Sequence, residues 1–248
     1  MAGSRTQKNN NKAGVNGKPD FFQQGIRWQE ILNKIKIMNR LISNFWDFFS
    51  AYSKSLLHLD VKAENGRKLF DRLNAMLHAY CKDLDCIITQ KKTGAELTVT
   101  AHGNPYLFKE AELLVHFAPL IYGWKITAFL QPDADLDKYR KGTDEMISFN
   151  GISLRISEIY FLPLEIKYRP NNLGIRVFIK NYLKHSNNKN LQEALYMQIE
   201  HLIGEKSFAN EVAFIEIAQL KEEMKQVTIP LFELGLYIQT FKKSFPLM

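Results

Sequence analysis

The residues of this sequence that could do chemistry at neutral pH gather where an alternating apolar stretch meets a helical one, at His102, Gly103, Asn104 and Tyr106. A strand that feeds the N-terminus of a helix leaves backbone N–H groups free, and such groups bind anions. The imidazole of His102 changes its charge near neutral pH. His185 occupies the corresponding loop in the second half of the chain. One hypothesis is therefore an enzyme or small-anion-binding protein, with the two histidines as catalytic candidates and the other three residues as binding candidates.

The same junction has a purely structural interpretation. Gly103 supplies φ freedom for a corner, and Asn104 is a good N-cap for a helix whose first position is Pro105, where the missing N–H costs nothing. A single histidine beside a helix cap is a small constellation for catalysis. The residue types favour this structural interpretation, whereas convergence of the loop residues on one pocket would favour the chemical one.

A calcium-binding pattern is present only in part. Asp133, Asp135 and Asp137 have the spacing of a calcium loop, but Lys138 and Asp144 stand where that loop needs a glycine and a glutamate. The sequence therefore predicts a solvated acidic loop.

Zinc and phosphate patterns are also incomplete. His78 and Cys81 lie one helical turn apart and Cys86 follows, but zinc needs a fourth ligand. The run "GEKS" at 204–207 lacks the upstream glycine of a phosphate loop, and a glutamate separates its glycine from its lysine. We interpret that glycine as a helix stop. No metal site and no cofactor are expected.

A long stripe of apolar residues opens the folded part. Between residues 28 and 56 they recur at alternating steps of three and four, which places them on one face of a helix. The residues are Trp28, Ile31, Ile35, Met38, Ile42, Phe45, Phe49, Tyr52 and Leu56. Because Ser43 and Asn44 are good capping residues, the pattern predicts two helices, 27–42 and 45–57, with the stripe mostly facing the protein's own core. The same spacing is that of a coiled-coil seam, so the first helix could instead be a partner surface.

The aromatic run "FWDFF" is expected to pack in the core rather than stack on nucleobases.

The remaining elements follow one order twice. A helix over 66–84 precedes a hairpin around "KKTG", a helix that begins at Asn104 and a strand "WKITAFL". In the second half, "EIYFLPLEIKY" and "LGIRVFIKNY" flank the turn signal "RPNN". A polar loop "LKHSNNKN", a helix "LQEALYMQIEHLIG", a strand "EVAFIEIAQL" and a closing helix after Pro230 complete the chain.

This order predicts an α+β fold, since a helix between two strands of one sheet must cross over it. We expect an antiparallel or mixed sheet of six or more strands with helices on one face, preceded by N-terminal helices. Two duplicated ferredoxin-like ββαβ halves are one arrangement that gives this order. The expected organisation is a disordered tail (1–19) and a single α+β domain (20–248), made of a helical part (20–83), a first ββαβ unit (84–131), a connecting loop (132–157) and a second ββαβ unit with a C-terminal helix (158–248).

Composition and charge limit the function classes. Hydrophobic residues make up 46% and charged residues 24% of the 248 residues, as in globular proteins. We expect a cytoplasmic protein, because no signal peptide or membrane span is evident and the two cysteines make no disulfide framework. The net charge is +7, and the tail 1–19 holds four basic residues and no acid. Nucleic acid is therefore an unlikely partner, since binders concentrate positive charge on a folded face.

From Phe45 onward the chain resembles an uncharacterised family of bacterial proteins. The motifs that carry the resemblance are "FWDFF", "TAHGN", "APLIYGW" with "AFLQP" after it, "IYFLPL", "GEKSFA" and "IPLFEL". They cover about four fifths of the chain and exclude residues 1–44. The resemblance implies no activity, cofactor or catalytic residue.

Without a catalytic constellation, we expect a non-catalytic protein-interaction module. Its partner would be another protein or a second copy of the chain, and not a membrane.

Overall fold

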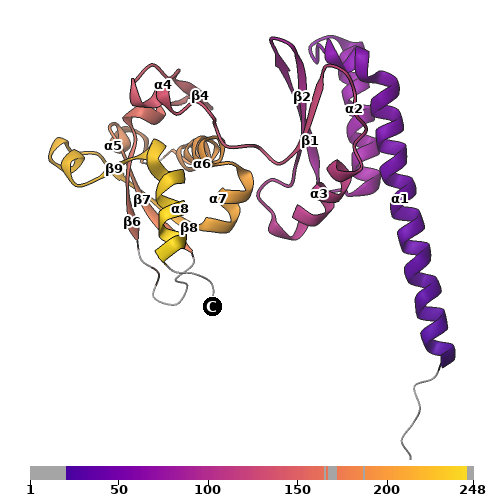
Figure 1. Ribbon diagram of the computed structural model, residues 1–248. Helices are drawn as coiled ribbons and strands as arrows, with labels where there is room; N and C mark the ends of the chain where they lie inside the picture. Colours follow the sequence, from indigo (N-terminus) through magenta and orange to yellow (C-terminus); the bar gives the residue numbers. More distant parts are fainter. Residues whose placement is uncertain (1–20, 165, 167–171, 187, 245–248) are drawn as a thin grey trace, which may run out of the picture. The chain divides into compact units, whose positions relative to one another are not determined.

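Helices combine with mixed and antiparallel sheets in this protein, which confirms the expected α+β class with N-terminal helices (Figure 1). The computed structural model describes residues 21–164, 166, 172–186 and 188–244. The predicted tail and residues 169–171 of the predicted turn lie outside this part. The chain divides into two compact units, residues 1–41 and 42–248. Among the described helices, none is both long enough and apolar enough to cross a membrane.

Helix α1 (Phe21–Leu57) is continuous, so the expectation of two helices was wrong. The hydroxyl of Ser43 donates to the carboxylate of Asp47 one turn later, at 3.2 Å, and does not cap a new helix. Serine and asparagine inside a helix cost at most about 0.7 kcal/mol each relative to alanine. Packing outweighs that cost, because Phe45 and Phe49 on the next two turns are fully buried.

The first half of residues 42–248 contains a three-stranded sheet in the order β1-β2-β3. β1 and β2 form the predicted antiparallel hairpin, and β2 and β3 are parallel, so the connection between them crosses over. The elements of this half after α1 are α2 (Glu64–Tyr80), β1 (Asp85–Lys91), β2 (Gly94–Thr100), η1 (Pro105–Leu107), α3 (Phe108–His116) and β3 (Trp124–Ala128).

The aromatic run of α1 lies in the core of this half, as expected. The ring of Phe49 meets the ring of Trp124 on β3 edge-on, with centroids 4.8 Å apart. Trp46 is also buried, and its indole N–H donates to the carbonyl of Leu114 on α3 at 2.9 Å. Helix α1 is thereby fixed to both β3 and α3.

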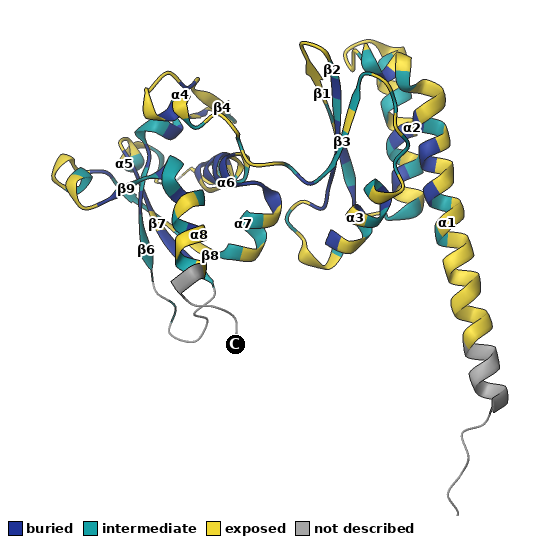
Figure 2. Cartoon of the chain, viewed as in Figure 1, coloured by how far each residue is buried: buried dark blue, intermediate teal, exposed yellow. Residues whose placement is uncertain are grey.

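The second half has a four-stranded sheet in the order β8-β7-β6-β9. β6 and β7 are antiparallel, and β7 and β8 are parallel across a helical crossover, so the ββαβ order of the first half recurs. The main elements are β6 (Tyr160–Leu164), β7 (Leu173–Ile179), α5 (Tyr182–His185), α6 (Asn190–Ile203), α7 (Glu205–Glu211), β8 (Val212–Gln219), η3 (Glu222–Gln226), β9 (Ile229–Pro230), η4 (Leu231–Glu233) and α8 (Leu234–Ser244). Figure 2 shows the buried residues of this half along α6 and the sheet.

Two expected loops contain regular structure. The segment 132–157 holds α4 (Asp137–Arg140) and a hairpin of β4 (Ile147–Phe149) and β5 (Ile152–Leu154), which leads into η2 (Ile156–Glu158). Alternate residues Ile152, Leu154 and Ile156 are buried, so this segment covers the core of the second half. The polar loop expected after β7 starts with α5. The strands of the described residues form three separate sheets instead of one.

Candidate functional site

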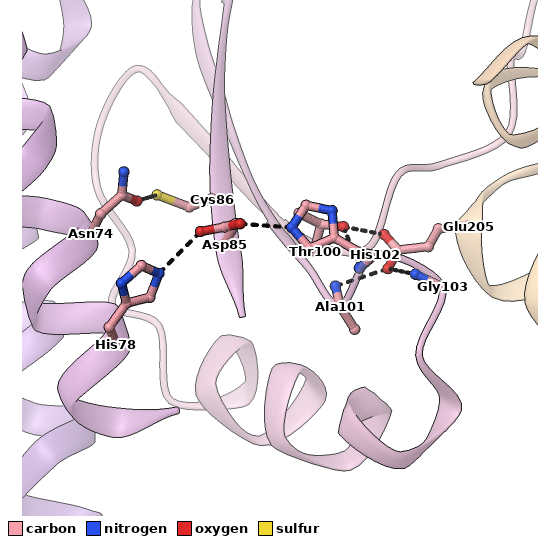
Figure 3. A network of polar contacts seen from close by, with 9 residues as sticks. All are labelled: Asn74, His78, Asp85, Cys86, Thr100, Ala101, His102, Gly103 and Glu205. Carbon is pink, nitrogen blue, oxygen red and sulfur yellow. Dashed lines mark hydrogen bonds and ion pairs between the residues drawn. The ribbon is translucent and has the colours of Figure 1, made fainter. Parts of the chain in front are cut away.

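The junction between β2 and η1 is filled by a carboxylate of the protein's own chain. Glu205, the first residue of α7, is fully buried. Figure 3 shows its carboxylate directed at Thr100, Ala101 and Gly103. Its Oε1 accepts hydrogen bonds from the backbone N–H groups of Ala101 (2.8 Å) and Gly103 (3.0 Å). Its Oε2 accepts from the hydroxyl of Thr100 (2.8 Å) and the N–H of Leu130 (3.2 Å). Four donors thus satisfy one buried carboxylate.

The backbone of the junction is shaped for this carboxylate. His102 and Gly103 have φ values of 50° and 70°. Successive residues in such conformations turn neighbouring N–H groups to one side and form an anion-binding concavity. The hydroxyl of Thr100 also accepts a hydrogen bond from the N–H of His102 at 3.0 Å, which fixes the corner.

The backbone conformation of Gly204 positions Glu205 at this concavity. It ends α6 with a φ of 84° and precedes α7, so the predicted helix stop is confirmed and a new helix starts directly after it. A Cβ at this position would lie 2.9 Å from the Cδ of Pro132 and 3.1 Å from the carbonyl oxygen of Leu130. That carbonyl accepts the N–H of Glu205 at 2.9 Å. Only glycine fits so close an approach.

The expected anion-binding groups therefore already have an acceptor. The N–H groups of Ala101 and Gly103 are directed at Glu205, and an external anion would have to displace a buried carboxylate to reach them. The binding of a small anion at this junction stays a prediction.

His102 takes part in a second cluster at the same junction. Its Nε2 lies 2.7 Å from one oxygen of Asp85, and Nε2 of His78 lies 3.0 Å from the other (Figure 3). An ionised carboxylate only accepts, so both rings carry a proton on Nε2. The hydrogen bonds from His102 and then from His78 lower the pKa of Asp85. Since these side chains are 44–61% exposed, the cluster is a surface feature.

No metal centre emerges from these side chains. Nitrogen–oxygen distances of 2.7 and 3.0 Å are those of direct hydrogen bonds. Cys86 is turned to the side-chain oxygen of Asn74 (3.2 Å), and burial, followed by the charge of Asp85, raises the pKa of its thiol to about 12. Within the described part of the chain, no three His, Cys, Asp or Glu side chains are grouped so that they could hold a metal ion.

A hollow of about 230 Å³ adjoins the junction. His102 and Gly103 line one part of it, and Tyr196, Glu200 and Phe208 are among the residues that line the rest. Burial raises the pKa of Glu200, Glu205 raises it further, and His102 opposes both effects. An imidazole and a carboxyl of raised pKa on one hollow are the groups that acid–base chemistry would use.

The other candidates are not among the residues that line this hollow. The side-chain oxygen of Asn104 accepts the N–H of Tyr106 at 3.1 Å, which is the predicted cap, and the Tyr106 side chain is 91% exposed. His185 ends α5 and is not among the residues that line the hollow. The structure thus groups only two of the five candidates, His102 and Gly103.

The calcium-like acidic residues have partners inside the protein. Asp133 accepts a hydrogen bond from the hydroxyl of Tyr139 (2.5 Å) and forms ion pairs with Lys138 (2.5 Å) and His201 (3.3 Å). Burial would raise the pKa of Asp133, but the hydrogen bonds from Lys138 and Tyr139 lower it to about 2. This carboxylate stabilises the start of the second half.

The stripe of α1 divides into two parts of opposite burial. Ile42, Phe45, Phe49 and Leu56 are buried in the core, whereas Trp28, Ile31 and Ile35 are 64%, 37% and 43% exposed. Tyr52, between the buried residues, is 37% exposed as well. Leu32 beside them is 53% exposed. The expectation that this stripe mostly faces the protein's own core was therefore wrong for residues 28–38. Figure 2 shows this stretch of α1 as exposed.

Family models, curated proteins and solved structures were each compared with the chain, and none matches it. The resemblance to a bacterial family stays a prediction. Its motifs nevertheless meet in space, because Thr100 to Gly103 of "TAHGN", Leu130 of "AFLQP" and Glu205 of "GEKSFA" form one hydrogen-bonded cluster.

Proposed function

We propose that this protein is a non-catalytic protein-interaction module whose contact surface is the exposed stripe of α1, defined as Trp28, Ile31, Leu32, Ile35 and Met38. One observation carries the proposal. The stripe has the apolar spacing of a packed helix, yet Trp28, Ile31, Leu32 and Ile35 are exposed. Further along the same helix, Ile42, Phe45, Phe49 and Leu56 at this spacing are buried. Large apolar side chains grouped on one face mark interaction sites.

The polar clusters support this proposal, because their hydrogen bonds and ion pairs are made within the protein. Glu205 takes up the N–H groups of the junction, and Asp133 is paired with neighbouring side chains. We further propose a cytoplasmic location, which the two free cysteines suit, and an internal duplication, which the recurring ββαβ order suits.

A crosslinking experiment tests the stripe as a contact. A photoreactive amino acid replaces Leu32 on the stripe or Ile37 on another face of the helix, in cells that naturally contain the protein. The two positions are similarly exposed, at 53% and 61%. We expect one discrete protein adduct from position 32 and none from position 37. The combined changes Ile31→Gln and Ile35→Gln should remove that adduct without lowering the melting temperature, because both side chains lie outside the core.

Equal crosslinking from positions 32 and 37, or an adduct that survives the double substitution, would contradict a contact through the stripe. An absence of adducts from both positions would contradict it as well.

The alternative function is an enzyme or small-anion-binding protein that uses the loops around His102 and His185. The pairing of His102 with Asp85 at 2.7 Å and its place on the hollow with Glu200 favour it. Two observations weigh against it: His185 is not among the residues that line this hollow, and the junction N–H groups have an internal acceptor. Binding of inorganic phosphate or a carboxylate that His102→Ala abolishes would support this alternative.

A further inference from the structure

We infer that the exposed stripe of α1 binds an acidic amphipathic helix of another protein, packed as a coiled coil. This inference rests on the proposed function and adds the chemistry of the partner. It follows from the charge of the N-terminal unit, from the geometry of the stripe and from the place where the stripe becomes buried.

Positive charge is concentrated in the unit that carries the stripe. Of the chain's 33 basic and 26 acidic residues, 8 and 2 lie in residues 1–41, which leaves 25 and 24 in residues 42–248. The net charges are therefore +6 and +1. A nearly neutral body is joined to a strongly basic N-terminal unit, so the expected partner surface is acidic.

The exposed turns of α1 repeat this imbalance locally. Over residues 28–41 the basic side chains are Lys34, Lys36 and Arg40, and the only acid is Glu30. All four are exposed, and none of them forms an ion pair with another described residue. In the body, by contrast, Lys125 is paired with Glu96 at 2.8 Å. The three cations beside the stripe are thus available to a partner.

The shape of the stripe favours a helix as the occupant. Trp28, Ile31, Ile35 and Met38 alternate at steps of three and four, which is the seam spacing of a helix pair, and Leu32 lies beside Trp28 and Ile35 on the same face. Ile37, an exposed apolar residue outside the stripe, lies off this face of the helix.

The seam continues into a helix packing that already exists. In one unbroken helix, Ile42, Phe45 and Phe49 follow at the same steps and are buried by the chain's own elements. The spacing does not change where burial begins, so residues 28–38 have the pattern of a packed helix without a described neighbour. A second copy of this chain would bring the same excess of cations to the contact, which disfavours self-pairing.

Two designed peptides test the inference on the full-length protein. Both have three heptads with isoleucine at position a and leucine at position d, and they differ only at positions e and g, which are glutamate in one and lysine in the other. Fluorescence anisotropy of the labelled peptides measures Kd at 50 mM and 500 mM NaCl. We expect the glutamate peptide to bind about tenfold more tightly than the lysine peptide at low salt, and the ratio to shrink at high salt.

Matched variants assign the binding to the stripe and to its cations. The combined changes Ile31→Gln and Ile35→Gln should abolish binding of the glutamate peptide, whereas Ile37→Gln should leave its Kd unchanged. Lys34→Glu together with Lys36→Glu should reverse the preference toward the lysine peptide. All five substitutions affect exposed positions, and circular dichroism confirms that each variant keeps its helix content.

Each alternative outcome of these experiments contradicts a specific part of the inference. Equal affinity for the two peptides removes the acidic partner but leaves the proposed function in place. Binding of neither peptide overturns the inference, and the crosslinking pattern then decides the proposed function separately. A dimer in sedimentation equilibrium that Ile31→Gln and Ile35→Gln dissociate would make the occupant a second copy. Binding to phosphatidylserine vesicles without any preference between the peptides would make the occupant a lipid surface.

Discussion

The junction at Thr100 to Gly103 and the exposed stripe of α1 each differ from what their residue types predict. The junction has the residues of a binding site, yet its hydrogen-bond donors are used by the buried carboxylate of Glu205. The stripe has the residues of a core, yet its side chains are exposed. We conclude that a polar group whose hydrogen-bond partners all lie within the protein is structural. An exposed apolar group without packing partners in the protein is a candidate for function.

The largest expected effect comes from the buried continuation of the stripe. We expect Phe49→Ala to lower the free energy of unfolding by about 3–5 kcal/mol, because it leaves a cavity beside Trp124. Ile35→Ala, on the exposed part of the same stripe, should change it by less than about 0.5 kcal/mol. Urea unfolding of the two variants measures the contrast. Similar losses would mean that residues 28–38 pack against the body, which would contradict the contrast between the exposed and the buried parts of the stripe.

A substitution of Glu205 tests the structural role of the junction at Thr100 to Gly103. Glu205→Gln keeps the shape of the side chain but replaces one oxygen by an NH₂ group, which cannot accept from the N–H groups of the junction. We expect a loss of about 2–3 kcal/mol, since buried donors lose their acceptor. Thermal unfolding measures it, and Glu112→Gln, at a half-exposed glutamate that is ion-paired with Lys206, serves as the control with a small effect. A Glu205 variant as stable as the wild type would show that the junction can release its internal ligand, and the anion-binding alternative would gain.

Asp133 should show a smaller effect that depends on pH. Its pKa of about 2 in the folded protein is below the ordinary value of 3.8, so its stabilisation is complete above about pH 4 and is lost as the pH falls toward 2. We expect Asp133→Asn to cost about 1–2 kcal/mol at pH 7 and much less at pH 2.5. Urea unfolding at the two pH values gives the difference. A cost that is independent of pH would assign the effect to packing rather than to charge.

Local patterns were sufficient for much of the fold. Alternation predicted β1, β2 and β8, the cap at Asn104 was read from its residue type, and the stop at Gly204 followed from a glycine after an apolar helix. Short strands were missed, because three residues such as those of β4 and β5 are too few to establish a period. The break expected near Ser43 failed because packing overrides a weak local preference.

The candidate site was less accessible from sequence, because its main contacts join distant residues. Glu205 and Ala101 are 104 positions apart, and nothing in the local pattern of "GEKS" indicates that its glutamate is a buried ligand. Asp85 was also missed, since its two histidine partners lie on α2 and beyond β2. The sequence contains the two parts, a glutamate directly after a helix-stop glycine and a glycine corner in "TAHGN", but it does not show that they meet.

The smallest expected effect concerns His102, the residue that first suggested chemistry. His102→Ala removes an exposed hydrogen bond to Asp85, which is worth at most about 1 kcal/mol at such a surface. It leaves untouched the backbone N–H groups of Ala101 and Gly103 that hold Glu205, because these do not depend on the imidazole. We therefore expect the variant to fold and to keep the affinity of the wild type for the glutamate peptide. Loss of binding in a folded His102→Ala protein would place the functional surface at the junction, and the stripe would then be the structural member of the pair.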